Sequence, residues 1–217
     1  NRTSETWSAQ MKEAMQGMKA KIIQSTSDEG KGILAYAEHT LGVTHSPDIF
    51  HVQHELCKAV AAPIAAKIRR SERAVLRAKE DLEAVKTENE DYLESIEDRG
   101  RGRPKDFIQH IAKAQLQLES EIRELERLSS IQEEMRGNTR GIGEVYHFLD
   151  PLTGERLSPG VVTQKIQDKI DRTRYLAEQE DLSESSLARI DKAERVLPKI
   201  TICLEFVSTY IRREIDK

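Results

Sequence analysis

Residues 67–98, KIRRSERAVLRAKEDLEAVKTENEDYLESIED, decide the fold. Mostly apolar side chains recur here every seven residues, and a second series follows three residues later. Such an a/d pattern, sustained over about four heptads, predicts a coiled-coil helix. Asn89 occupies an a position, where we interpret it as fixing the register of the pair. The two series are Ile68, Val75, Leu82, Asn89 and Ile96, and then Ser71, Ala78, Val85 and Tyr92.

A second apolar series follows a break at Arg99–Pro104, which contains glycine and proline. Two heptad helices joined by a short turn predict an antiparallel coiled-coil hairpin, here over residues 56–136. The series changes phase near its end, and its members are Ile108, Ile111, Leu118, Ile122 and Leu125, followed by Leu128 and Met135.

The C-terminal part is predicted to be a second, plain helical hairpin over residues 158–217. Ser158 followed by proline is an N-cap signature for a helix that ends near Glu180. Ser183 caps the last helix, which we expect to bend at Pro198 because proline removes one helical hydrogen bond. The glycine-containing residues 137–157 are expected to form an irregular connector.

Residues 1–55 alternate between helical and strand patterns, which predicts a small parallel α/β layer. Two parallel strands are too few for a stable sheet, so further strands are expected beside them. The expected elements are a helix over Trp7–Met18 capped by Thr6, a strand over Lys19–Thr26, a helix that stops at Gly42, and a strand over Val43–Phe50. The predicted fold class is therefore mainly α, with this partial α/β segment at the N-terminus.

The composition of the chain bears on its cellular location. It has 217 residues, with 34 lysines and arginines against 38 acids and a formal net charge of −4. No apolar run is long enough for a membrane span or a signal peptide. Two cysteines, Cys57 and Cys203, form no disulfide framework, so we predict a cytoplasmic location without membrane partners.

Acidic side chains follow both predicted strands. Asp28 comes just after the first strand, and Asp48 and His51 lie at the end of the second. Sites in open α/β layers form beyond the carboxyl ends of parallel strands, and carboxylates there can hold Mg²⁺. The other interpretation is that Asp28 and Glu29 are the acidic N-terminus of a helix. The residues alone leave both readings open.

The segments Ser27-Asp28-Glu29-Gly30 and Asp48-Ile49-Phe50-His51 resemble motifs of bacterial insertion-sequence transposases of the DDE type. These enzymes have an RNase H-like catalytic fold, in which one strand ends at the second catalytic aspartate. A (Cys/Asp)-x-x-His motif follows one helix and one strand later. Residues 146–154 and 192–197 are similar to one branch of the family, in which a helical insertion separates the second and third acids.

The resemblance implies roles for particular residues. Asp28 matches the second metal-binding acid, and Asp48 and His51 match the motif that supports the site. The first acid is expected before residue 1, and neither Glu205 nor Glu214 matches the glutamate motif of the third. The chain then is a transposase fragment, expected to be inactive alone, whose intact form uses Mg²⁺ or Mn²⁺ for hydrolysis and strand transfer at transposon ends.

The residues that follow Asp48 have a second interpretation, as a zinc site. His51, His54 and Cys57 are spaced by three residues, and such side chains can ligate zinc. This spacing drifts around the helix and places Cys57 beside apolar Ala61 and Ile64, so zinc is not expected. A zinc-dependent hydrolase would also lack a third ligand and a general base.

Charge is divided unevenly along the first heptad helix. Residues 67–79 contain six bases and one acid, whereas residues 80–98 contain nine acids and one base. Two readings stay open: a solvated helix face, or contacts to DNA phosphates. The predicted DNA contacts are Lys67, Arg69, Arg70, Arg73 and Arg77, together with Arg101 and Arg103 in the turn. The main functional rival is a coiled-coil module whose only activity is homo-oligomer formation or partner binding.

Overall fold

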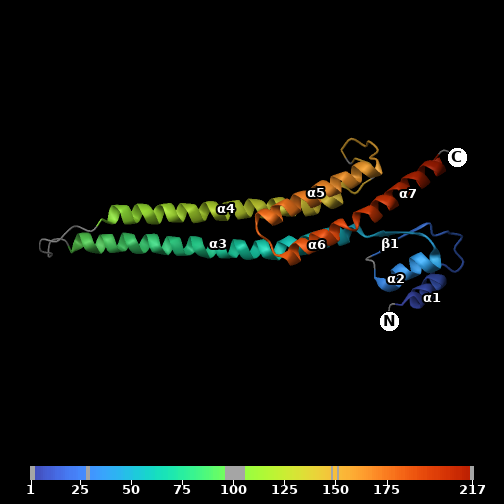
Figure 1. Ribbon diagram of the computed structural model, residues 1–217, viewed down its shortest axis with the longest axis horizontal. Helices are drawn as coiled ribbons and strands as arrows, with labels where there is room; N and C mark the ends of the chain where they lie inside the picture. The colour runs from blue at the N-terminus through green and yellow to red at the C-terminus, as the bar shows by residue number, and fades with distance from the viewer. Residues whose placement is uncertain (1–2, 28–29, 96–105, 148, 151, 216–217) are drawn as a thin grey trace. The chain divides into compact units, whose positions relative to one another are not determined.

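The chain is mainly α, as predicted, and it carries a small two-stranded sheet (Figure 1). The computed structural model describes residues 3–27, 30–95, 106–147, 149–150 and 152–215. The strands are β1 (Gln24–Ser27) and β2 (Thr44–Pro47). The helices are α1 (Ser4–Ala14), α2 (Lys31–Ala35), the π-helical η1 (Tyr36–Leu41), α3 (Ile49–Glu94), α4 (Phe107–Val145), α5 (Pro159–Gln179), α6 (Glu184–Glu194) and α7 (Leu197–Ile215).

The elements belong to two compact units. The first, which we call the mixed unit, comprises residues 1–60 and 135–217, and the second, the hairpin unit, comprises residues 61–134. Helices α3 and α4 each contribute to both units. Within the described parts of the chain, no helix combines the length and apolar character that crossing a bilayer requires.

The sheet of the mixed unit is parallel, as the sequence predicts. Gln24 pairs with Thr44 and Ser27 with Pro47, and the backbone N–H of Asp48 extends the ladder by donating to the Ser27 carbonyl at 2.9 Å. In a parallel ladder only alternate residues face the partner strand. The backbone groups of Gln24 and Thr26 therefore face away from β2, toward the outer edge of β1. On β2 the outward positions are His45 and Pro47, and Pro47 has no N–H to offer a further strand.

Local signals explain the ends of these short elements. Gly42 follows η1 with φ at +63°, the left-handed conformation that favours glycine, and it ends the helix where predicted. The cap of α1 was predicted wrongly: Thr3, not Thr6, is the N-cap, and its hydroxyl accepts from the Thr6 N–H at 3.4 Å. Both threonines satisfy the residue preference at this position, so the sequence alone does not separate them.

Apolar side chains from five helices form the core of the mixed unit. The fully buried members include Val52 and Leu56 of α3, Ile142 of α4, Val162, Ile166 and Ile170 of α5, Ile190 of α6, and Ile200 of α7. Ser158 and Ser183 cap α5 and α6, as predicted, by accepting from Val161 and Ser186.

The last helix was expected to be continuous and bent, but it is divided. Helix α6 ends at Glu194 and α7 begins at Leu197, so Pro198 lies in the first turn of a new helix. A proline there removes an N–H that would have had no helical partner, whereas inside a helix it would break a bond.

The hairpin unit consists of the two antiparallel segments of α3 and α4, side by side in Figure 1. The Tyr92 and Phe107 rings meet at 5.3 Å between centroids, and every described residue of the predicted α3 series is buried or half-buried. Ile96 and the predicted turn at Arg99–Pro104 lie outside the described residues. The coiled-coil geometry of the pair stays a prediction.

The α4 series differs from the prediction at its first member. Ile108 is 83% exposed, and the neighbouring Phe107 is buried instead, because its ring packs on Tyr92. Counted from Phe107, buried and half-buried positions recur at unbroken heptad spacing, so no change of phase occurs. The series is Phe107, Ile111, Ala114, Leu118, Glu121, Leu125 and Leu128.

Helix α4 also continues through the first part of the expected connector, to Val145. Its glycines leave room for polar side chains of the mixed unit. A Cβ on Gly141 would lie 2.6 Å from Lys169 Nζ, and one on Gly143 would lie 2.9 Å from Gln53 Nε2. Gln53 Nε2 donates to the Thr139 carbonyl at 3.2 Å, so Gly143 lets α3 bond to the backbone of α4.

Alanine substitutions should distinguish a glycine of α4 with open space around it from one that leaves room for Gln53. Gly137 has no atom within 4 Å of an added Cβ, so Gly137→Ala should raise the free energy of unfolding by about 1 kcal/mol through helix propensity. Gly143→Ala should gain less, because the methyl group displaces Gln53 from Thr139. Denaturant unfolding of the two variants measures the difference, and equal gains would show that the Gln53 bond contributes nothing.

Candidate functional site

The candidate site lies where both strands of the sheet end. Ser27 and Pro47 are the last residues of β1 and β2, and they are paired with each other. In the sequence, Asp28 follows the first and Asp48 follows the second. Asp28 lies outside the described residues, so its predicted catalytic and metal-binding role stays a prediction.

Asp48 starts helix α3. Its Oδ1 accepts from the Phe50 N–H at 2.9 Å, and its carbonyl accepts from the His51 N–H at 2.9 Å. This is the geometry of a helix N-cap, which satisfies amides at the start of the helix. Oδ2 has no hydrogen-bond donor among the described residues, so Asp48 can offer one carboxylate oxygen outward while it caps.

His45 of β2 lies between two serines of β1, close to the same strand ends. His45 Nδ1 is 2.7 Å from Ser25 Oγ, and Nε2 is 3.3 Å from Ser27 Oγ. Both ring nitrogens therefore have hydroxyl partners, and these fix the plane of the imidazole. Sequence reasoning missed this group. The available signal was the Ser-x-Ser spacing of β1, which places both hydroxyls on one face of the sheet.

Two more titratable side chains, Tyr146 and Cys203, lie near Ser46 of the sheet. Burial raises the pKa of the Tyr146 hydroxyl and of the Cys203 thiol, beside Ser46 of β2. A buried thiol with a raised pKa stays protonated at neutral pH and is a poor nucleophile. These side chains are part of the packing behind the strands.

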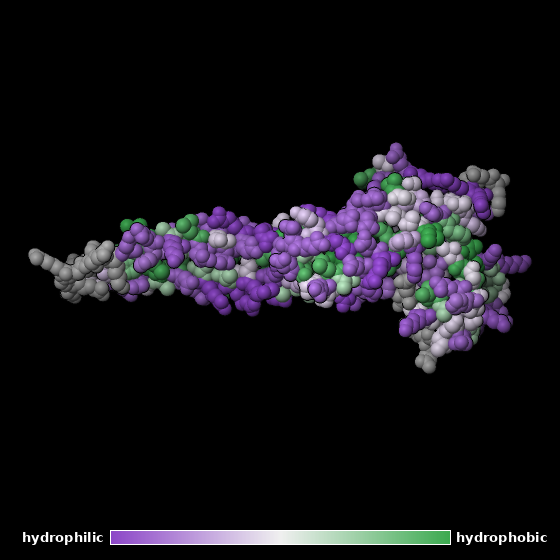
Figure 2. Space-filling model, viewed as in Figure 1, coloured by the Kyte–Doolittle hydropathy of each residue, from purple (hydrophilic) through white to green (hydrophobic). Residues whose placement is uncertain are grey.

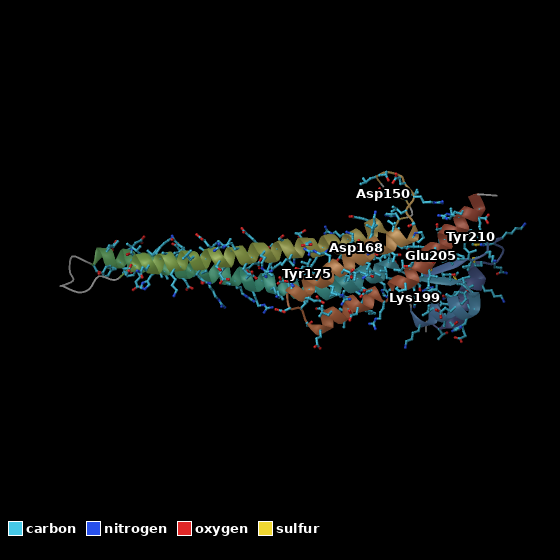
Figure 3. The ribbon with its side chains drawn as sticks, turned by 45° about the horizontal axis from the view of Figure 1, so that its top comes forward. Asp150, Asp168, Tyr175, Lys199, Glu205 and Tyr210 are labelled. Atoms are coloured by element: carbon cyan, nitrogen blue, oxygen red, sulfur yellow. The ribbon has the colours of Figure 1, made fainter. Side chains whose placement is uncertain are left out.

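The zinc interpretation finds no support at the start of α3. His51 is half-buried, whereas His54 and Cys57 are exposed, so the expected apolar surroundings of Cys57 were wrong. No three histidine, cysteine or acidic side chains of the described residues lie together as a metal site. Asp48 on its own therefore fits a metal only as one carboxylate of a larger set. Glu205, one of the acids weighed for the third catalytic position, projects from α7 (Figure 3).

A buried carboxylate holds the start of α3 in place. Glu55 is only 5% exposed, and its two oxygens accept from Arg189 at 2.9 Å and Lys192 at 2.8 Å, both on α6. Helix α6 is in turn tied to α5, where Arg174 bonds to Asp191 and Glu194. The turn of α3 that follows Asp48 and His51 is thus fixed by charge-assisted bonds.

The predicted DNA-contacting bases of the hairpin unit fall into two groups. Arg69, Arg73 and Arg77 are exposed and form no hydrogen bond or ion pair within the described residues, whereas Arg70, also exposed, donates to the Ala66 carbonyl. Lys67 and Arg70 line a hollow of about 260 Å³ together with Ser71, Leu128 and the acids Glu121 and Glu124. The hydrogen bond from Arg127 and the charge of Lys67 hold the pKa of Glu124 below its ordinary value. Arg101 and Arg103 lie outside the described residues.

Comparisons with protein-family models, with curated proteins and with solved structures find no match for this chain. The resemblance to DDE transposases therefore rests on the sequence segments at residues 27–30, 48–51, 146–154 and 192–197.

The Glu55 ion pairs give a pH-dependent prediction. Lys192, the main cause, lowers the pKa of Glu55 below 4.5, so the pairs stabilise the fold fully above pH 4.5 and are lost as the pH falls through the lowered pKa. Glu55→Gln should cost about 2 kcal/mol at neutral pH, the scale of charge-assisted hydrogen bonds.

Unfolding of the native chain and the variant across pH tests this expectation, with Glu205→Gln at an exposed position of α7 as the matched control. The cost of Glu55→Gln should shrink in acid, and the control should lose little at any pH. A cost that does not change with pH would contradict the role of the ion pairs.

Proposed function

We propose that this chain is part of a DDE-type transposase, which acts in DNA transposition by metal-dependent phosphodiester hydrolysis and strand transfer. The observation that carries the proposal is the paired end of β1 and β2. Each strand is followed in the sequence by an aspartate, and the Asp-x-Phe-His motif coincides with the first turn of α3. This is the edge at which open parallel layers bind ligands.

The proposed chemistry needs divalent ions held by several carboxylates. Mg²⁺ or Mn²⁺ activates a water, and then a DNA 3′-hydroxyl, for in-line attack on a phosphodiester. Asp28 contributes one acid to such a site. Asp48 and His51 support it, and Glu55 fixes the helix that carries them. The further acids come from other parts of the protein, so this chain alone is expected not to cut DNA.

The sheet supports an assembly of this kind. A two-stranded parallel sheet with four-residue strands is marginal alone, and the outward N–H and C=O groups of Gln24 and Thr26 leave β1 able to accept a further strand. An RNase H-like core of more strands is the proposed completion of the layer. A bacterial cytoplasm, where the DNA lies, is the proposed location.

A second candidate function is protein association through the hairpin unit. The outside of α4 carries two exposed apolar side chains, Ile108 at 83% and Leu116 at 63% exposure. Figure 2 shows a mostly hydrophilic hairpin surface with separate apolar spots. In this candidate the two side chains would contact another protein surface, such as a second copy of the chain.

Binding to labelled duplex DNA, followed by fluorescence anisotropy, separates the two candidates. The transposase proposal expects binding that weakens steeply as the salt concentration rises, because phosphate contacts release counterions. If the chain is an association module, its average molar mass, measured by light scattering, should increase with protein concentration, and it should have no affinity for DNA. The second outcome would overturn the transposase proposal.

A further inference from the structure

Three arginines of the hairpin unit share one side of α3. Arg69, Arg73 and Arg77 are four residues apart, and all three are exposed. Side chains four residues apart are neighbours on a helix, with a rise of about 6 Å between them. Within the described residues, none of the three guanidinium groups has a hydrogen bond or an ion pair.

Of the other three bases of this segment, Lys67 and Arg70 have their charge offset within the hairpin, and Lys79, two residues after Arg77, lies on another side of the helix. Arg70 Nε points back along the helix and donates to the Ala66 carbonyl at 3.4 Å. Arg70 and Lys67 line the hollow that contains Glu121 and Glu124. The six bases of residues 67–79 are therefore not equivalent, although the sequence presents them as one run.

The exposed side also carries an apolar group. Leu76 is 57% exposed, and it lies three residues after Arg73 and directly before Arg77. Like charges at four-residue spacing destabilise a helix, and among the described residues no acid forms an ion pair with this row. An anionic ligand with several charges in a row would remove that repulsion.

We infer that Arg69, Arg73 and Arg77 bind successive phosphates along one strand of a DNA duplex. Guanidinium groups bind phosphate oxygens through paired hydrogen bonds, and the step between these arginines is close to the spacing of adjacent phosphates. Leu76 lies between them, against the sugars. This inference rests on the proposed function and deepens it, because it assigns DNA contact to this row and not to Lys67 or Arg70.

The test compares two triple variants that remove the same charge. Arg69→Gln, Arg73→Gln and Arg77→Gln together should reduce the slope of log affinity against log salt by about 2.7, the value for three lost phosphate contacts. Lys67→Gln, Arg70→Gln and Lys79→Gln together should change the slope by less than about 0.9, the value for one phosphate contact. Circular dichroism checks that both variants keep their helices.

The results distinguish this inference from the proposed function. Equal losses of slope in both variants would show a general effect of charge and overturn the arginine row. DNA binding with an unchanged slope in the arginine variant would overturn the row alone and leave the transposase proposal standing. A native chain that does not bind DNA at all would overturn both. If the arginine variant lost as much affinity for polyglutamate as for DNA, the row would suit an acidic protein partner. That result would also overturn the inference.

Discussion

The parallel pairing of β1 with β2 is the constraint on which the candidate site depends. Parallel strands need a crossover, here α2 and η1, and they end at the same edge of the sheet. Asp48 takes part in both elements at that edge: its N–H closes the ladder on Ser27, and its carboxylate caps α3. The long helix therefore begins at the point where the acidic motif lies, and Glu55 ties its first turns to α6.

Much of the fold follows from local signals in the sequence. The heptad series gave the buried positions of α3, Ser158 and Ser183 gave two helix starts, and Gly42 gave a helix end. The errors occur where two local signals are equally good or where packing decides. Ile108 and Phe107 are adjacent apolar residues, and only contact with Tyr92 selects the ring. The glycines of α4 predicted a loop, but two of them, Gly141 and Gly143, lie in the helix where Lys169 and Gln53 pack against it.

The candidate site was predictable only in part. Asp48 and His51 lie at the end of the second strand and the start of a helix, as their pattern indicated. The His45 group depends on the register between strands, and the Glu55 ion pairs join residues more than 130 positions apart, so neither is visible in one segment. Net charge was similarly uninformative, because an acidic total conceals an exposed row of arginines on one side of α3.

We propose that the ends of β1 and β2 contribute to a divalent metal site. Titration with paramagnetic Mn²⁺, followed by NMR, tests it most directly, because broadening reports which amides lie near the ion. The amides of Ser27 and Asp48 should broaden first, and Asp28→Asn should remove the effect. Broadening confined to the acidic residues 80–94 of α3, or unchanged by Asp28→Asn, would contradict this proposal.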